Sequence, residues 1–222
     1  MRTQSNLLAL SIACILFIIF FSASRPTWAQ AGLSEAYVLT EDDLAFMPQF
    51  CRAKVTKKLP KNVYEGWSNK FGPENWLHMH HYCFGLKALQ LSYSNFRDLT
   101  SRTYQARVAE TEFNYVLRHS EEDFYMRPEI LVHRGRAQTL ARAYEPAKKS
   151  FEEALKINPK SVDAWVALGD LYSLIGRKND AIKTLEQAIE VTGEEQNKKI
   201  LLRLNDLRST NSQSKKPSLP AE

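Results

Sequence analysis

Two stretches that share one pattern decide the fold of this chain: residues 131–159, LVHRGRAQTLARAYEPAKKSFEEALKINP, and residues 165–193, WVALGDLYSLIGRKNDAIKTLEQAIEVTG. A shift of 34 positions superposes small, apolar and turn residues of the two stretches: Leu131 on Trp165, Gly135 on Gly169, Ala147 on Ala181, Phe151 on Leu185, Ala154 on Ala188 and Pro159 on Gly193. This repetition predicts two copies of one structural unit.

Each copy is predicted to be an antiparallel pair of helices. In the second copy, Trp165, Gly169 and Tyr172 share one face of a first helix, and Gly169 leaves room for a second helix to pack closely. Ser161 is placed to cap the start of that first helix, and Gly176 is placed to end it. One pair cannot bury its apolar stripe alone, so neighbouring pairs must stack.

This pattern resembles the tetratricopeptide repeat family, with clear repeats at residues 128–161 and 162–195. The resemblance implies an all-α fold, in which antiparallel helix pairs stack into a short right-handed solenoid closed by a C-terminal capping helix. In this family the inner, concave face is lined mainly by the first helix of each pair and commonly holds a peptide or partner segment.

Residues 73–127 are interpreted as a divergent pair of the same kind. If Gly85 takes the place of Gly135, the partner helix carries Ala109, Phe113 and Val116, the same small, aromatic and aliphatic order. The interval from Gly85 to Ala109 is 24 residues instead of 12, so about 12 residues around 92–104 must lengthen the first helix or the loop.

The chain after the repeats divides into two parts. Residues 196–208 place Ile200, Leu201, Leu204 and Leu207 on one side, which predicts a capping helix over the last apolar seam. Residues 209–222, rich in serine and lysine and with two prolines, are predicted to be a disordered tail.

Residues 1–29 are predicted to be an export signal. A positive charge at Arg2 precedes an almost wholly apolar run over residues 7–21, and small residues follow as candidate cleavage sites. An uncleaved anchor over residues 6–24 is the alternative; in both cases the remainder is exported, to the periplasm or beyond. Removal of two arginines lowers the formal charge from +5 to +3, and this charge without a basic stripe makes nucleic acid a poor partner.

Residues 30–72 form an extension that resembles no family. A short helix is expected from about Glu41, with an interruption at Pro48, and the polar segment 57–69 is interpreted as a loop. Cys51 and Cys83 are a candidate disulfide, because an exported compartment permits it; the alternative is two buried thiols that do not meet.

A histidine cluster lies on a helix expected from Pro73 to about Leu91. Glu74, His78 and His81 share one face of this helix, whereas His80 and Cys83 share another. The division leaves too few ligands on either face for a tetrahedral metal site, so these residues are interpreted as part of a packed helix interface. A metal-binding or redox protein using His78, His80, His81 and Cys83 is kept as the alternative function.

By resemblance to the repeat family, eight residues are expected to face the groove: Glu129, Val132, His133, Arg136, Asp163, Val166, Asp170 and Ser173. The family variant that clamps a terminal carboxylate uses lysine, asparagine and arginine at such positions. Here Asp163 and Asp170 would repel a carboxylate, so that clamp is not predicted and the face has mixed charge.

Arg134 stands where the next repeat has Leu168, in an otherwise apolar seam. Three placements are open: it reaches out beside the divergent unit, pairs with a carboxylate there, or joins a site with Arg136 and His133.

No nucleophile elbow, glycine-rich phosphate loop or paired-carboxylate motif occurs in the sequence, so neither an enzyme nor a cofactor is predicted. The predicted function is an exported scaffold that binds a polypeptide partner in an assembly of the cell envelope. A membrane-anchored spacer is a third, purely structural reading.

Overall fold

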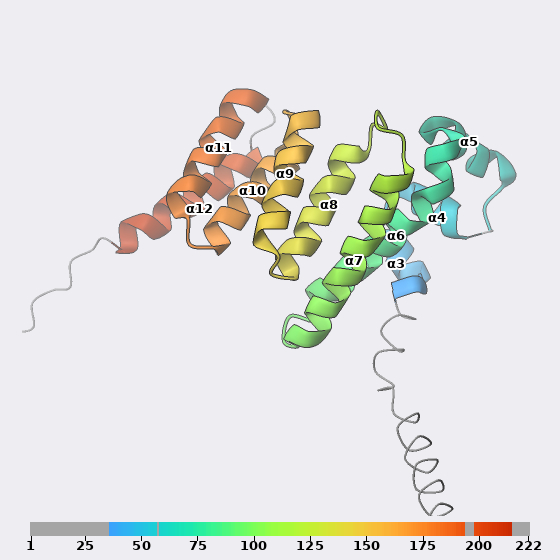
Figure 1. The fold of residues 1–222 in the computed structure, drawn as a ribbon, viewed down its shortest axis with the longest axis horizontal. Helices are drawn as coiled ribbons and strands as arrows, with labels where there is room; N and C mark the ends of the chain where they lie inside the picture. The colour runs from blue at the N-terminus through green and yellow to red at the C-terminus, as the bar shows by residue number, and fades with distance from the viewer. Residues whose placement is uncertain (1–35, 57, 194–197, 215–222) are drawn as a thin grey trace, which may run out of the picture.

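The computed structural model describes residues 36–56, 58–193 and 198–214, and within them the chain forms α-helices and no strand (Figure 1). The predicted export signal at 1–29, the alternative anchor at 6–24 and residues 215–222 lie outside the described residues. None of the helices in the described part of the chain is both long and apolar enough to cross a membrane.

Between residues 41 and 72, the described part of the N-terminal extension forms the short helices α3 (Glu41–Phe46), α4 (Gln49–Val55) and α5 (Lys61–Phe71). Thr40 caps α3, because its hydroxyl accepts from the Asp43 amide while the Asp43 carboxylate accepts from the Thr40 amide. Pro48 separates α3 from α4, as the sequence predicted, since proline is tolerated only at the start of a helix.

The predicted loop over 57–69 is wrong from residue 61 onwards, because α5 occupies Lys61–Phe71. Pro60 precedes the first turn, where its missing amide hydrogen costs nothing. Trp67 and Phe71 lie one turn apart and stack at 5.8 Å, and Phe71 stacks in turn on Trp76 at 5.6 Å. This aromatic packing stabilises a helix in a segment whose composition favours a turn.

Seven further helices follow as three antiparallel pairs and one closing helix. The pairs are α6 (Pro73–Ser94) with α7 (Leu99–His119), α8 (Arg127–Leu140) with α9 (Tyr144–Ile157), and α10 (Val162–Leu174) with α11 (Lys178–Thr192); α12 (Lys198–Ser214) closes the series. Ser161 caps α10 as predicted, and Gly176 follows it with a φ of +79°. The extra residues of the first pair lengthen both of its helices.

The pairs stack side by side along one direction (Figure 1). The first helices α6, α8 and α10 contact one another in sequence and α12 contacts α10, whereas α7, α9 and α11 have no comparable contacts among themselves in the described residues. One apolar core runs through the stack from Ala36 to Leu207. The protein is therefore an all-α solenoid with an inner layer of first helices and an outer layer of second helices.

A glycine allows each pair to pack closely. A Cβ built on Gly85 would lie 2.8 Å from the Phe113 ring, and one on Gly169 would lie 3.0 Å from the Leu185 side chain. Gly135 faces Phe151 in the same way. The α6–α7 pair thus has the same internal packing as the two clear repeats.

Helix α12 continues to Ser214, whereas the sequence predicted a tail from 209. No proline or glycine occurs between 198 and Pro217, so no residue type stops the backbone hydrogen bonding at 208. Ile200, Leu204 and Leu207 are buried, and α12 covers the last pair as a capping helix.

Candidate protein-binding surface

The face formed by α6, α8 and α10 is called the inner surface from here on, and three hollows among the described residues lie on it. The first hollow, of about 540 Å³, lies between α3, α6 and α8. The second, of about 280 Å³, lies between α8 and α10, and the third, of about 330 Å³, lies where the N-terminal parts of α8 and α10 meet.

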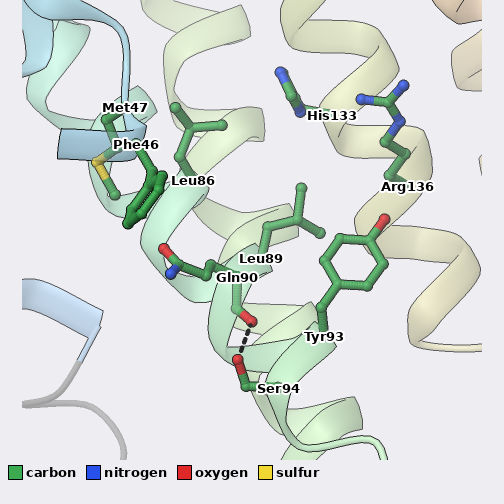
Figure 2. Close-up of a pocket in the computed structure, with 9 residues that line it drawn as sticks. All are labelled: Phe46, Met47, Leu86, Leu89, Gln90, Tyr93, Ser94, His133 and Arg136. Atoms are coloured by element: carbon green, nitrogen blue, oxygen red, sulfur yellow. Dashed lines mark hydrogen bonds between the residues drawn. The ribbon is translucent and has the colours of Figure 1, made fainter. Parts of the chain in front are cut away.

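Arg136 lines all three hollows. It lies on α8, in the middle of the stack, and Tyr93 of α6 lines the first two hollows with it. Figure 2 shows the Tyr93 hydroxyl pointing toward the aliphatic part of the Arg136 side chain, whose guanidinium lies farther away, near His133. Desolvation of its hydroxyl raises the pKa of Tyr93 above its ordinary value, although about half of the side chain is exposed, so the hydroxyl stays neutral and available for hydrogen bonding.

Seven of the eight predicted groove residues line these hollows. Glu129, Val132, His133, Arg136 and Asp163 line the third hollow, and Val166 and Asp170 line the second. Val132 is only 2% exposed and so offers little contact area. Ser173 is exposed and lines none of the three hollows.

The acidic groups of α10 are paired with cations of α12. Lys199 Nζ lies 3.2 Å from Asp163, and Arg203 Nε lies 2.6 Å from Asp170. Arg136 is farther from Asp163, at 3.9 Å. Burial raises the pKa of Asp170, although Arg203 opposes the shift. The sequence alone predicted that this face would repel the carboxylate of a ligand. The ion pairs with α12 reduce that repulsion.

Sequence reasoning did not foresee these pairs. A signal was present: Asp163 and Asp170 are seven positions apart on one face of α10, and Lys199 and Arg203 are four apart on one face of α12. Matching such faces requires knowing that α12 packs beside α10, which the repeat pattern alone does not give.

Glu129 is held at the edge of the inner surface by two neighbours. The His133 Nε2 atom lies 3.9 Å from its carboxylate, and the buried Tyr82 hydroxyl donates a hydrogen bond to it at 2.6 Å. His133 and Tyr82 hold the pKa of Glu129 below its ordinary value, against the effect of burial. The His133 ring stacks on Phe113 at 5.6 Å, and its Nδ1 atom is buried without a hydrogen-bond partner in the described residues.

The apolar wall of the first hollow was also missed from sequence. Phe46, the last residue of α3, and Met47, which follows it, lie on the same side of the hollow as Leu86 of α6 (Figure 2). The only sequence signal was Phe46 itself, an aromatic residue next to acidic positions, and it could not reveal that α3 folds back onto α6.

The histidines expected on α6 make local contacts, either with α7 or within α6 itself. His81 Nδ1 lies 2.6 Å from the buried Glu112 carboxylate, and its ring stacks on Tyr115 at 3.7 Å. His80 Nδ1 lies 3.0 Å from the Leu77 carbonyl, and His78 lies 5.0 Å from His119 between ring centroids. Burial and neighbouring positive charges lower the pKa values of His78 and His80.

No group of three or more His, Cys, Asp or Glu residues in the described ranges is placed to bind a metal ion. The sulfur of Cys83 is bonded to Cys51, with the two sulfur atoms 2.11 Å apart, and Glu74 is exposed. The disulfide connects α4 to α6. Of the residues proposed for the alternative metal or redox function, Cys83 is therefore in a disulfide, and the three histidines contact different neighbours on α6 and α7.

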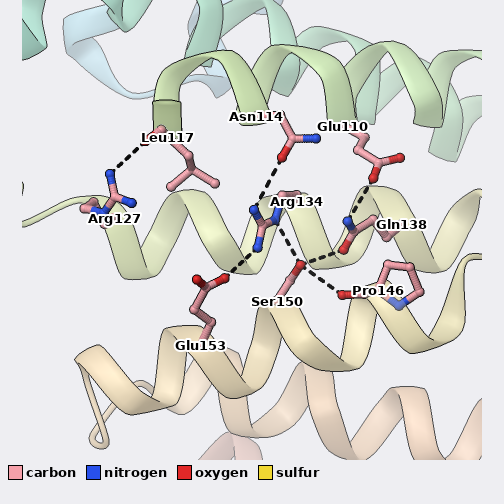
Figure 3. Close-up of polar contacts among 9 residues, drawn as sticks. All are labelled: Glu110, Asn114, Leu117, Arg127, Arg134, Gln138, Pro146, Ser150 and Glu153. Atoms are coloured by element: carbon pink, nitrogen blue, oxygen red, sulfur yellow. Dashed lines mark hydrogen bonds and ion pairs between the residues drawn. The ribbon is translucent and has the colours of Figure 1, made fainter. Parts of the chain in front are cut away.

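Arg134 belongs to a polar network between helices and not to the inner surface (Figure 3). Its guanidinium donates to Ser150 at 3.0 Å, to Asn114 at 3.3 Å and to Glu153 at 2.7 Å. Ser150 also donates to Gln138, which donates to Glu110. Of the placements open from sequence, Arg134 reaches the α6–α7 unit through Asn114, and its carboxylate partner comes from α9.

Residues 139–201 match the family model described as Tetratricopeptide repeat. No curated protein matches the chain.

Proposed function

Because this chain is a tetratricopeptide repeat protein, we propose that it is an exported scaffold that binds a polypeptide partner on its inner surface, within an assembly of the cell envelope. Repeats of this family generally serve protein–protein interaction. We propose no catalytic role, because the inner surface combines apolar, acidic and basic groups without a nucleophile paired to a base.

The observation that carries this proposal is the convergence of three hollows on Arg136. Together they extend across α6, α8 and α10, on helices that are already ordered. A preformed surface reduces the entropy that binding must offset.

Two features support export. The apolar N-terminal stretch behind Arg2 has the composition of a signal, and small residues follow it. The bond between Cys51 and Cys83 supports the same proposal, since disulfides persist mainly in oxidising compartments.

Site-specific photo-crosslinking in the native cells tests the surface. A photoreactive residue would replace Gln90 or Thr139, which line the first and second hollows. Lys149 of α9 and Lys183 of α11 are the matched controls, because both are exposed on the outer layer. Crosslinks to one polypeptide from the inner positions alone are expected; crosslinks confined to Lys149 and Lys183 would refute the assignment.

Export is tested separately on the same cells. Intact-mass analysis of the purified chain shows whether residues 1–29 are removed, and fractionation shows the compartment. Recovery of a full-length chain from the cytosol would contradict the proposed location while leaving the binding surface untouched.

A further inference from the structure

The first hollow has an apolar wall to which α6 and the N-terminal extension both contribute. Phe46 is 86% exposed and Tyr93 is 53% exposed, and Met47, Leu86 and Leu89 line the same hollow. Helix α3, which carries Phe46, is held in place: the buried Asp43 carboxylate accepts from Lys87 of α6 at 2.6 Å. Phe46 is therefore presented to solvent by a fixed helix, beside other apolar side chains.

The opposite wall of the hollow carries the guanidinium of Arg136. Arg136 and His133 come from α8, and none of the residues that line this hollow is acidic. The Asp163 carboxylate lies 3.9 Å from Arg136 but only 3.2 Å from Lys199. Arg136 therefore shares this carboxylate with Lys199, which lies closer to it. The Arg136 guanidinium is thus the charged group in this hollow that a carboxylate would complement.

The hollow does not end at Arg136. Tyr93 and Arg136 also line the second hollow, which continues toward Val166 and Asp170. A bound chain can therefore pass Arg136 and continue along the inner surface. This continuity favours a carboxylate on a side chain inside a segment over the carboxylate at a chain end.

We propose that the first hollow binds an internal Asp or Glu side chain of the partner at Arg136, together with an adjacent bulky apolar side chain that packs on Phe46 and Leu89. The N-terminal helix α3 thereby forms part of the binding site. This inference rests on the proposed function and specifies the chemistry of its partner.

Fluorescence anisotropy with the full chain and synthetic peptides tests this. The probe is a labelled nine-residue peptide, acetylated and amidated at its ends, with Leu-Glu-Phe at the centre of a Ser-Gly background. Matched peptides carry Leu-Gln-Phe or Ser-Glu-Ser instead, and a fourth lacks Glu but ends in Leu-Phe with a free carboxylate. Hydrogen bonds to charged groups predict binding of Leu-Glu-Phe about 10- to 100-fold tighter than that of Leu-Gln-Phe.

Three variants locate the site. Arg136→Gln is expected to weaken the Leu-Glu-Phe peptide to the level of Leu-Gln-Phe and to leave the latter unchanged. Phe46→Ser is expected to weaken both peptides by a similar factor. Arg142→Gln, an exposed arginine outside the three hollows, is the control and should change nothing. Thermal unfolding of each variant establishes that the fold is intact.

Several outcomes overturn the inference: no saturable binding of Leu-Glu-Phe, equal affinity for the Glu and Gln peptides, binding of the free-carboxylate peptide alone, or no effect of Phe46→Ser. If these results accompany crosslinks from Gln90 and Thr139, the proposed partner chemistry is wrong while the proposed function stands. If the crosslinks are also absent from those positions, both proposals fail.

Discussion

The ring of Phe151 fills the space that a side chain at Gly135 would need. A Cβ built on Gly135 would lie 2.7 Å from Cδ1 of that ring, and closer still to Cε1. Phe151 is buried against α8, so the ring has little freedom to move away. The glycine repeated at 34-residue spacing is therefore set by the approach of two helices.

We expect Gly135→Ala to lower the free energy of unfolding by about 1–3 kcal/mol, the range for overpacked cores. Gly66→Ala is the matched control: Gly66 lies inside α5 and a Cβ there meets nothing within 4 Å. It should stabilise by up to about 1 kcal/mol, since alanine favours helices over glycine. Urea unfolding measures both, and equal effects of the two substitutions would contradict the packing argument.

Reduction of the bond between Cys51 and Cys83 is expected to lower stability by about 3–4 kcal/mol, the chain-entropy value for a loop of 32 residues. Both cysteines are buried, so alanines at these positions remain compatible with the core. Denaturant unfolding with and without dithiothreitol makes the measurement. The double variant Cys51→Ala, Cys83→Ala is the control, and dithiothreitol should not change its free energy of unfolding. A loss of equal size in this variant would contradict the prediction.

Arg134→Ala should lower the free energy of unfolding by about 1–3 kcal/mol, because its partners Ser150 and Asn114 lose a charged donor inside the helix interface. Glu153→Ala removes only the outer partner, whose side chain is 55% exposed, and should cost about 0–1 kcal/mol. Chemical unfolding compares the two variants. A larger loss for Glu153→Ala would show that the network is supported from its surface end instead.

Mild acid should weaken the α6–α7 interface. Burial and nearby cations lower the pKa values of His78 and His80, so the unfolded chain takes up protons first as pH falls through about 6.5. The free energy of unfolding should therefore decrease below about pH 6.5. His81, His119, Lys54 and Glu74 also act on these two rings.

Unfolding curves at a series of pH values test this. Replacing His78 and His80 with Gln should flatten the dependence above about pH 5. The loss below about pH 4 should persist as an internal control, because Lys87 and Thr40 hold the pKa of Asp43 below its ordinary value despite burial. If the free energy of unfolding of the variant kept the same slope near pH 6, groups other than His78 and His80 would cause the pH dependence.

The repeats could be predicted from sequence because their packing is local. Gly169 meets Leu185 only 16 positions later, and the same spacing joins Gly135 to Phe151. Helix α5 could not be predicted, because its stability comes from Trp67 and Phe71 packing with Trp76 and Phe50, while Pro60 and Gly66 give the segment the composition of a turn.

The candidate site likewise has a part that could be predicted from the sequence and a part that could not. The family pattern placed Arg136 and Asp170 on the first helices, where the repeat register fixes them. Phe46 and Arg203 approach that surface from helices outside the repeats, across 90 and 33 positions from Arg136 and Asp170 respectively. No periodicity links such distant segments, so their contribution appears only in three dimensions.

The unequal lengths of the three pairs have a consequence for how a ligand is aligned. Helix α6 has 22 residues and α8 has 14, so α6 is longer by about 12 Å at the usual helical rise (Figure 1). On a stack of identical units, a bound segment could be aligned in several equivalent registers, which differ by a shift of one repeat. Here one end of the surface carries the long α6–α7 pair and α3, and the other end carries the cations of α12. Only one register of a bound segment matches both ends.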